Sequence, residues 1–118
     1  EHLRSCLNGM YVQVFALDTL VKSELMTNEP LDRDHVTLHI RNNPQIFSHL
    51  NIVAPPEQHW PDLGLTLDEQ SDFDLLKVII EHFYDKNPLF SCLDVVRFLR
   101  TNQQLVDINS EVLRKGNT

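Results

Sequence analysis

Residues 65–80 read LTLDEQSDFDLLKVII, and they predict a short apolar strand, an acidic turn and an amphipathic helix without a break. Ser71, followed three residues later by Asp74, resembles a capping box at the helix start. A carboxylate between a strand and a helix is a common place for a metal or phosphate ligand in α/β proteins. Asp68 is that carboxylate, which makes it a candidate metal ligand. An acidic helix start explains the same residues without a metal.

Further elements are predicted on both sides of this stretch. The predicted strands are 10–17, 51–56 and 65–67, and the predicted helices are 18–27, 31–43, 71–86, about three turns from Ser91, and 103–116 with an interruption near Asn109. This order indicates a mixed, helix-rich α/β fold with about three short strands and four to five helices. Strands as short and few as these would be more stable as parts of a larger sheet.

Composition excludes several classes of protein. A chain of 118 residues is expected to form a single domain, and its formal net charge of −7 argues against binding nucleic acid or an anionic membrane surface. No apolar run is long enough to span a membrane. Two cysteines, Cys6 and Cys92, are too few for a disulfide scaffold, so a reducing cytoplasm is the simpler expectation, although a bridge between them stays open.

Polar residues cluster in the predicted helix 31–43. Arg33 and His35, with an aspartate before each, could supply a cation and a general base, or could simply solvate a first helical turn. His35 and His39 are four residues apart, a spacing that lets two imidazoles share a metal on one helix. The zinc hypothesis is weak, because no Glu follows His35 and no clear third ligand is present.

Two other side chains have a functional and a structural interpretation. Cys92 lies in the first turn of a predicted helix, where the helix dipole could lower its thiol pKa, but its apolar neighbours favour burial. Trp60 lies in the proline-rich connection 54–64, where it could stack on a ligand. A loop anchor packed on the core is the simpler interpretation of Trp60.

Four segments together resemble a known family. In order they are YVQVFALDTL (11–20), LDRDHVTLHIRNNPQIF (31–47), LGLTLDEQSDFDLLKVIIEHFY (63–84) and NPLFSCLDVVRFLRTNQQLVDIN (87–109). They resemble the C-terminal half of the spore-coat polysaccharide biosynthesis F-type cytidylyltransferases, relatives of the acylneuraminate and 3-deoxy-manno-octulosonate cytidylyltransferases. The resemblance covers about residues 9 to 115.

The resemblance implies a fold, an activity and site residues. The chain, residues 1–118, is expected to be one C-terminal part of a Rossmann-like nucleotidyltransferase that joins CMP from CTP to an acidic sugar, releases pyrophosphate and uses Mg²⁺. Asp68 aligns with the metal-holding aspartate of the family's valine-Asp-Thr-Pro-Glu-Asp segment. Arg33 and His35 match the family's Arg-Glu-His-Val-Thr segment, either near the sugar site or at a subunit contact, and are the candidate catalytic residues.

The chain also departs from the family pattern. Tyr11 and Gln13 replace the two acidic residues of the usual Asp-Val-Glu-Val-Phe strand, and the family's N-terminal nucleotide-binding half has no counterpart here. The isolated chain is therefore expected to be inactive and to bind Mg²⁺ weakly. The alternative is a non-catalytic interaction module that forms a homodimer through apolar helix faces around Phe73, Phe83, Phe90 and Phe98.

Overall fold

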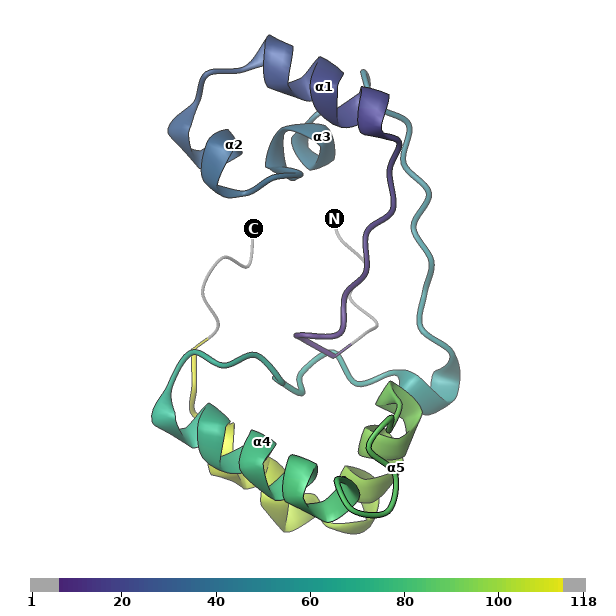
Figure 1. Cartoon of the computed structure of the whole chain (residues 1–118), viewed down its shortest axis with the longest axis vertical. Coiled ribbons are helices and arrows are strands. Elements are labelled where there is room, and N and C mark those ends of the chain that lie inside the picture. Colours follow the sequence, from purple (N-terminus) through teal and green to yellow (C-terminus); the bar gives the residue numbers. More distant parts are fainter. Residues whose placement is uncertain (1–6, 114–118) are drawn as a thin grey trace. The chain divides into compact units, whose positions relative to one another are not determined.

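The computed structural model describes residues 7–113, and helices dominate it (Figure 1). The elements are α1 (Leu17–Met26), α2 (Pro30–Asp34), α3 (Leu38–Asn42), the 3₁₀ helix η1 (Pro56–Gln58), α4 (Gln70–Phe83), α5 (Cys92–Thr101) and the 3₁₀ helix η2 (Gln103–Asn109). Contacts divide the chain into two compact units, residues 12–52 and the remainder, which are described separately below. The prediction of a helix-rich fold is confirmed. Cys6 and the end of the predicted segment 103–116 lie outside the described residues.

The three predicted strands are not seen in the described part of the chain. Its β pairing consists of one parallel bridge between Asn8 and Gly64, in which the Asn8 N–H donates to the Leu63 carbonyl (2.9 Å) and the Leu65 N–H to the Asn8 carbonyl (2.7 Å). A strand needs a neighbour for its backbone N–H and C=O groups. The segment around Val14, whose exposed fraction is 93%, is not paired with another strand.

Gly9 allows the bridge to form. Its φ of +100° lies in the region that side chains disfavour, and a Cβ atom at this position would lie 2.8 Å from the backbone carbonyl carbon and oxygen of Leu65. A larger residue would therefore separate the segments on either side of the bridge.

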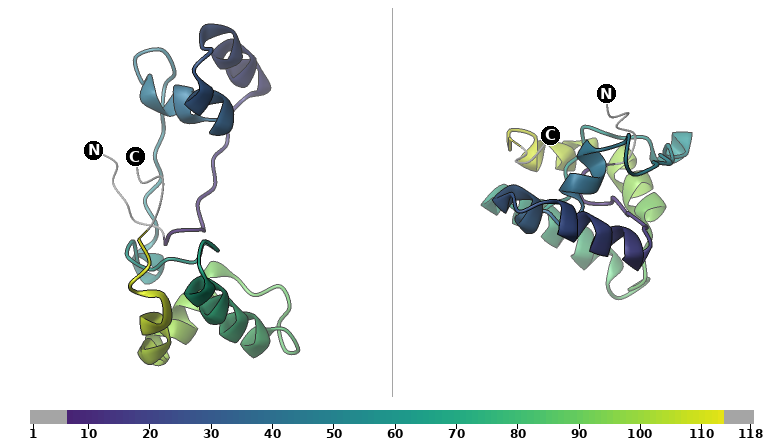
Figure 2. Two further views of the ribbon diagram at one scale, coloured as in Figure 1. Left: turned by 90° about the vertical axis from the view of Figure 1, so that its left-hand side faces the viewer. Right: turned by 90° about the horizontal axis from the view of Figure 1, so that it is seen from above.

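The core of the larger unit lies between α4, α5 and η2, and η2 packs against both α4 and α5 (Figures 1 and 2). It consists of fully or nearly fully buried aliphatic side chains: Leu7, Leu63, Leu65, Leu75, Ile79, Val95, Val96 and Leu99. Three of the four phenylalanines predicted to form a self-association surface, Phe83, Phe90 and Phe98, pack partly buried against this core. Phe73 of that set is exposed, and self-association through this surface stays a prediction.

Helix α4 begins two residues before the predicted capping box. Glu69, in an extended conformation (φ −132°, ψ 170°), is the N-cap, and its partner is Asp72. The Asp72 carboxylate accepts the Glu69 N–H at 3.0 Å, while the Glu69 side chain accepts the Asp72 backbone N–H. Ser71 lies inside the first turn, so the Ser71–Asp74 prediction is corrected.

Helix α5 begins where the sequence predicts. The Ser91 N–H donates to Asp94 Oδ2 (2.9 Å), and the Asp94 N–H donates to Ser91 Oγ (3.2 Å), which completes a capping box. Val95, Val96 and Leu99 form the buried face of the helix. Among the described residues, no helix is long and apolar enough to cross a membrane.

The smaller unit contains α1, α2 and α3. The single helix predicted over 31–43 is wrong, because α2 ends at Asp34 and α3 begins at Leu38. His35 is extended (φ −110°, ψ 91°), and two adjacent β-branched residues, Val36 and Thr37, follow it. These residues have low helix propensity, which favours a break here.

Candidate functional site

Asp68 lies in the turn that leads into α4. Its side chain is exposed, and its Oδ2 accepts a hydrogen bond from Thr66 Oγ1 at 3.2 Å. Its backbone N–H donates to Asp72 Oδ2 at 3.0 Å. The predicted metal ligand is thus presented to solvent beside the N-terminus of a fourteen-residue helix. The partial positive charge at a helix N-terminus attracts anions such as phosphate.

A buried polar network lies beneath this turn. The Asp72 side chain is fully buried, and its Oδ1 accepts a hydrogen bond from Asn109 Nδ2 at 2.8 Å. The same amide nitrogen donates to the Gly64 carbonyl, also at 2.8 Å. The sequence singled out Asp68 and placed Asp72 in the same acidic cluster, but it did not predict that Asp72 is buried or that it bonds to Asn109. A carboxylate three residues after Glu69 was the available local signal, but nothing local pointed to Asn109.

The donor set at Asp68 provides one ligand for a hard cation. Across residues 7–113 there is no group of three or more His, Cys, Asp and Glu side chains that could hold a metal. Mg²⁺ commonly takes one or two carboxylates and completes its coordination with waters and substrate phosphates. An exposed aspartate fits that partial role.

Arg33 forms a clamp on the end of α1. Its Nη1 donates to Glu24 Oε1 (2.9 Å), and its Nη2 donates to the Glu24 carbonyl (3.3 Å), the Thr27 carbonyl (3.1 Å) and Asn28 Oδ1 (3.3 Å). The last carbonyl groups of a helix lack partners within the helix, and a guanidinium can supply several donors to them. In this structure the Arg33 head group therefore binds its own unit.

His35 lies at an open surface depression of the same unit. The lining residues are Gln13, Phe15, Asp34, His35, Val36, Thr37 and Arg41. Thr37 Oγ1 donates to Gln13 Oε1 at 2.6 Å. Gln13, which stands where the resembled family has an acidic residue, is therefore bonded to the segment 33–37 that contains Arg33 and His35. The depression combines an exposed imidazole, a cation, a carboxylate and an aromatic ring, which suits a polar ligand.

His39 does not share a helix with His35. The structure places His35 at the end of α2 and His39 in α3, so the spacing argument for a shared metal fails. The His39 ring is mostly buried: its Nδ1 lies 3.3 Å from Asn43 Nδ2 and 3.6 Å from Asp32 Oδ2, and the ring contacts Phe47 edge-on. His39 is a packing residue of the smaller unit.

The candidate residues are divided between the two units. Arg33 and His35 belong to unit 12–52, whereas Asp68 belongs to the other unit. Arg33 and His35 are neighbours in sequence, but the Arg33 guanidinium is engaged with α1 while His35 lines the depression.

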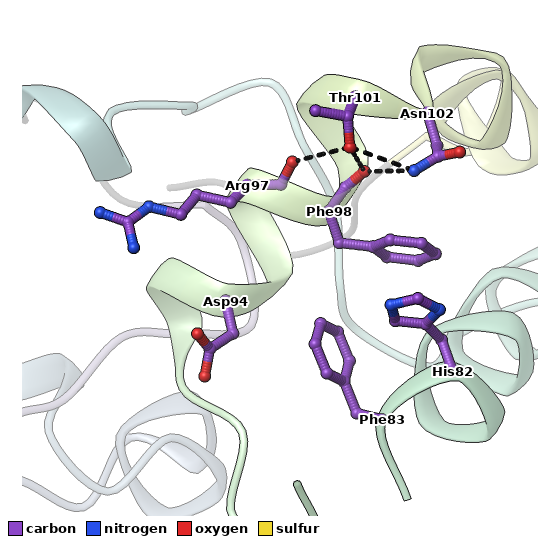
Figure 3. Close-up of a pocket in the computed structure, with 7 residues that line it drawn as sticks. All are labelled: His82, Phe83, Asp94, Arg97, Phe98, Thr101 and Asn102. Carbon is purple, nitrogen blue, oxygen red and sulfur yellow. Dashed lines mark hydrogen bonds between the residues drawn. The ribbon is translucent and has the colours of Figure 1, made fainter. Parts of the chain in front are cut away.

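A second depression, which the sequence did not predict, lies between α4 and α5 (Figure 3). It is lined by His82, Phe83, Asp94, Arg97, Phe98, Thr101 and Asn102. The His82 ring stacks on Phe98 with 3.9 Å between centroids and 13° between planes. Hydrogen bonds from the backbone and side chain of Ser91 hold the pKa of Asp94 below its ordinary value, and Asn87 and Arg97 act in the same direction.

Trp60 and Cys92 take structural positions. Trp60 packs partly buried against the core, and the Arg100 guanidinium lies 5.6 Å from its ring centroid. Arg100 Nη2 also donates to the His59 carbonyl at 3.2 Å, which ties the loop to α5. The prediction of Trp60 as a loop anchor is confirmed. Cys92 is partly buried against the same core, as the packing interpretation expects.

Comparison with known proteins gives two relatives. The chain is 30% identical over 113 residues to the uncharacterized protein MJ1063 of Methanocaldococcus jannaschii, an alignment of 96% of this chain and 46% of that protein. It is 28% identical over 80 residues to the spore coat polysaccharide biosynthesis protein SpsF of Bacillus subtilis, 68% of this chain and 33% of that protein. No protein-family model and no solved structure matches the chain.

These similarities support the resemblance in part. The chain is distantly similar to a protein of spore coat polysaccharide biosynthesis. It spans less than half the length of either of these relatives.

Proposed function

We propose that this chain is the C-terminal part of a nucleotidyltransferase of the CMP-sugar-acid synthetase type. The complete protein would join CMP from CTP to an acidic sugar and release pyrophosphate. The observation that carries this proposal is the 80-residue similarity to SpsF, a protein of polysaccharide biosynthesis. The exposed carboxylate of Asp68 beside the N-terminus of α4 supports it, because this chemistry needs a group that helps to neutralise phosphate charge.

Each candidate residue has a role within this proposal. Asp68 would be one ligand of Mg²⁺, and the metal would stabilise negative charge on the reacting phosphate and on pyrophosphate. His35, at the depression that also holds Thr37 and Arg41, would contact the acidic sugar. Arg33 would act by fixing the segment that carries His35, because its guanidinium is bonded to the end of α1.

The proposal is tested in the complete parent protein. Pyrophosphate release from CTP and a nonulosonate-type sugar acid should depend on Mg²⁺, and Asp68→Asn should lower its rate by about 100-fold or more. Asp74→Asn is the matched control, because Asp74 is another exposed carboxylate at the start of α4 and accepts a hydrogen bond from Gln70. A rate like that of the unmodified protein in Asp68→Asn would remove the metal role of Asp68.

A second candidate function is a non-catalytic module that associates with a second copy of itself. The observation that favours it is the exposure of large apolar side chains in the smaller unit: Val12, Val14, Leu17, Leu25, Leu50 and Ile52. These residues lie outside the set of phenylalanines named from the sequence. Large apolar side chains that gather at a surface are typical of interaction sites.

A further inference from the structure

Two parts of the chain that are far apart in sequence, residues 64–72 and η2, meet at one buried carboxylate, that of Asp72. Asp72 Oδ2 accepts the backbone N–H groups of Asp68 and Glu69, both at 3.0 Å, and Asp72 Oδ1 accepts Asn109 Nδ2 at 2.8 Å. Asn109 itself is 4% exposed and also donates to the Gly64 carbonyl. The segment before the turn, the turn itself and η2 are therefore held by one side-chain pair.

The burial of this pair shows that its hydrogen bonds matter. A carboxylate removed from water is stable only where donors replace the lost hydration, and Asp72 accepts N–H groups from Asp68, Glu69 and Asn109. The ordinary role of a residue at this position is to cap the helix through a single N–H, that of Glu69. Asp72 also accepts the N–H of Asp68, so the same carboxylate fixes the backbone of the candidate metal ligand.

We propose that Asp72 and Asn109 form a positioning pair that fixes the Asp68 turn, so that η2 is part of the Asp68 site although it lies about forty residues away in the sequence. The role of this pair in function rests on the proposed metal role of Asp68. The pair acts by restricting the backbone of Asp68 and Glu69, because Asn109 binds one oxygen of the Asp72 carboxylate while the other oxygen accepts both N–H groups.

The proposal predicts which backbone amides exchange faster when Asn109 is changed. Asn109→Ala removes the donor to Asp72 Oδ1, and hydrogen exchange of the Asp68 and Glu69 amides should then become about tenfold faster in the full chain. Exchange at the Ile79 amide, in the middle of α4, should change much less. Asn109→Ser is the milder variant for the case in which Ala prevents folding, because its hydroxyl keeps one donor, and a smaller acceleration at the same two amides is expected.

Asn102→Ala is the matched control. Asn102 Nδ2 donates to the Phe98 carbonyl at 2.9 Å, so this variant removes a comparable hydrogen bond near the same segment without contacting Asp72. It should leave exchange at Asp68 and Glu69 unchanged relative to Ile79. Equal acceleration at the turn and at Ile79 in the Asn109 variants would overturn the proposal, because it would show a general loss of stability.

The exchange experiment needs no nucleotide, sugar or metal, so its result is independent of the proposed reaction. In the complete protein, Asn109→Ala should then raise the Mg²⁺ concentration that gives half-maximal pyrophosphate release by about tenfold, by analogy with changes around other metal sites. An unmodified parent protein that releases no pyrophosphate would refute the proposed function alone. An unchanged Mg²⁺ requirement in an active Asn109→Ala protein would refute the positioning role.

Discussion

Arg33 shows how one side chain can hold a helix end and a functional segment together. Its guanidinium bonds two backbone carbonyls at the end of α1, and it also forms an ion pair with Glu24 at 2.9 Å. Both partners of that ion pair are about half exposed, and exposed pairs of this kind contribute little to stability. The carbonyl contacts should therefore matter more than the ion pair.

This difference gives a prediction for Arg33. Arg33→Lys keeps the charge but loses the planar set of donors, and it should lower the stability of α1 by about 1 kcal/mol. Glu24→Gln removes only the ion pair and should cost less than about 0.5 kcal/mol. Amide hydrogen exchange along α1 measures both effects. An equal loss in the two variants would show that the ion pair, rather than the carbonyl contacts, is what stabilises the helix end.

The two capping boxes show how far helix starts could be predicted from the sequence. Ser91 and Asp94 are three residues apart and satisfy each other, so the start of α5 can be found in the sequence. The start of α4 uses an equally local pair, Glu69 and Asp72, but Glu is not a favoured N-cap residue, so the pattern pointed to Ser71 instead. Only the bond between Asp72 and Asn109 joins residues that no local pattern connects. The three predicted strands are not seen in the described residues, and a period-two pattern predicts a strand but does not supply its neighbour.

The same reasoning applies to the candidate site. The position of Asp68 before a helix was predictable from residues 65–80, and so was an exposed carboxylate there. The break between α2 and α3 was not, because adjacent Val36 and Thr37 weaken a helix without defining where it ends. That break separates His35 from His39 and removes the pairing on which the zinc hypothesis depended.

The capping box of α5 gives a prediction for pH. Hydrogen bonds from Ser91 lower the pKa of Asp94 in the folded chain, so ionised Asp94 contributes stability above its ordinary pKa. That contribution is lost as the pH falls through the lowered value. Asp94→Asn should therefore be less stable than the unmodified chain at neutral pH, and the two should converge at pH values below the lowered pKa. Thermal unfolding across this range measures the difference.

Two variants sharpen the test of this capping box. Ser91→Ala removes the hydroxyl that accepts the Asp94 N–H and should lower the unfolding free energy by about 1 kcal/mol at neutral pH. Asp85→Asn, at an exposed position after α4, is the control for a general change in charge. If Asp85→Asn changed the pH profile as much as Asp94→Asn does, net charge rather than the capping box would be responsible.

The two units of the molecule differ in how many apolar side chains they bury and expose. The larger unit has a continuous aliphatic core, whereas the smaller unit buries few apolar side chains and exposes many. Small units with little core usually depend on contacts with something else. We predict from the sequence that the two units together form one domain of a longer protein. The two relatives are more than twice as long as this chain.

Exposed valines in the smaller unit give the last prediction. Val12 and Val14 are highly exposed on alternate positions of a segment without strand pairing in this structure, so a second chain could cover them. The chain should therefore show a mass that rises with concentration above the 13.7 kDa of one copy. The double variant Val12→Ser and Val14→Ser should shift the mass toward one copy, while Leu89→Ser, at an equally exposed position in the larger unit, should not. Light scattering over a range of concentrations measures this, and a constant mass of one chain would contradict self-association.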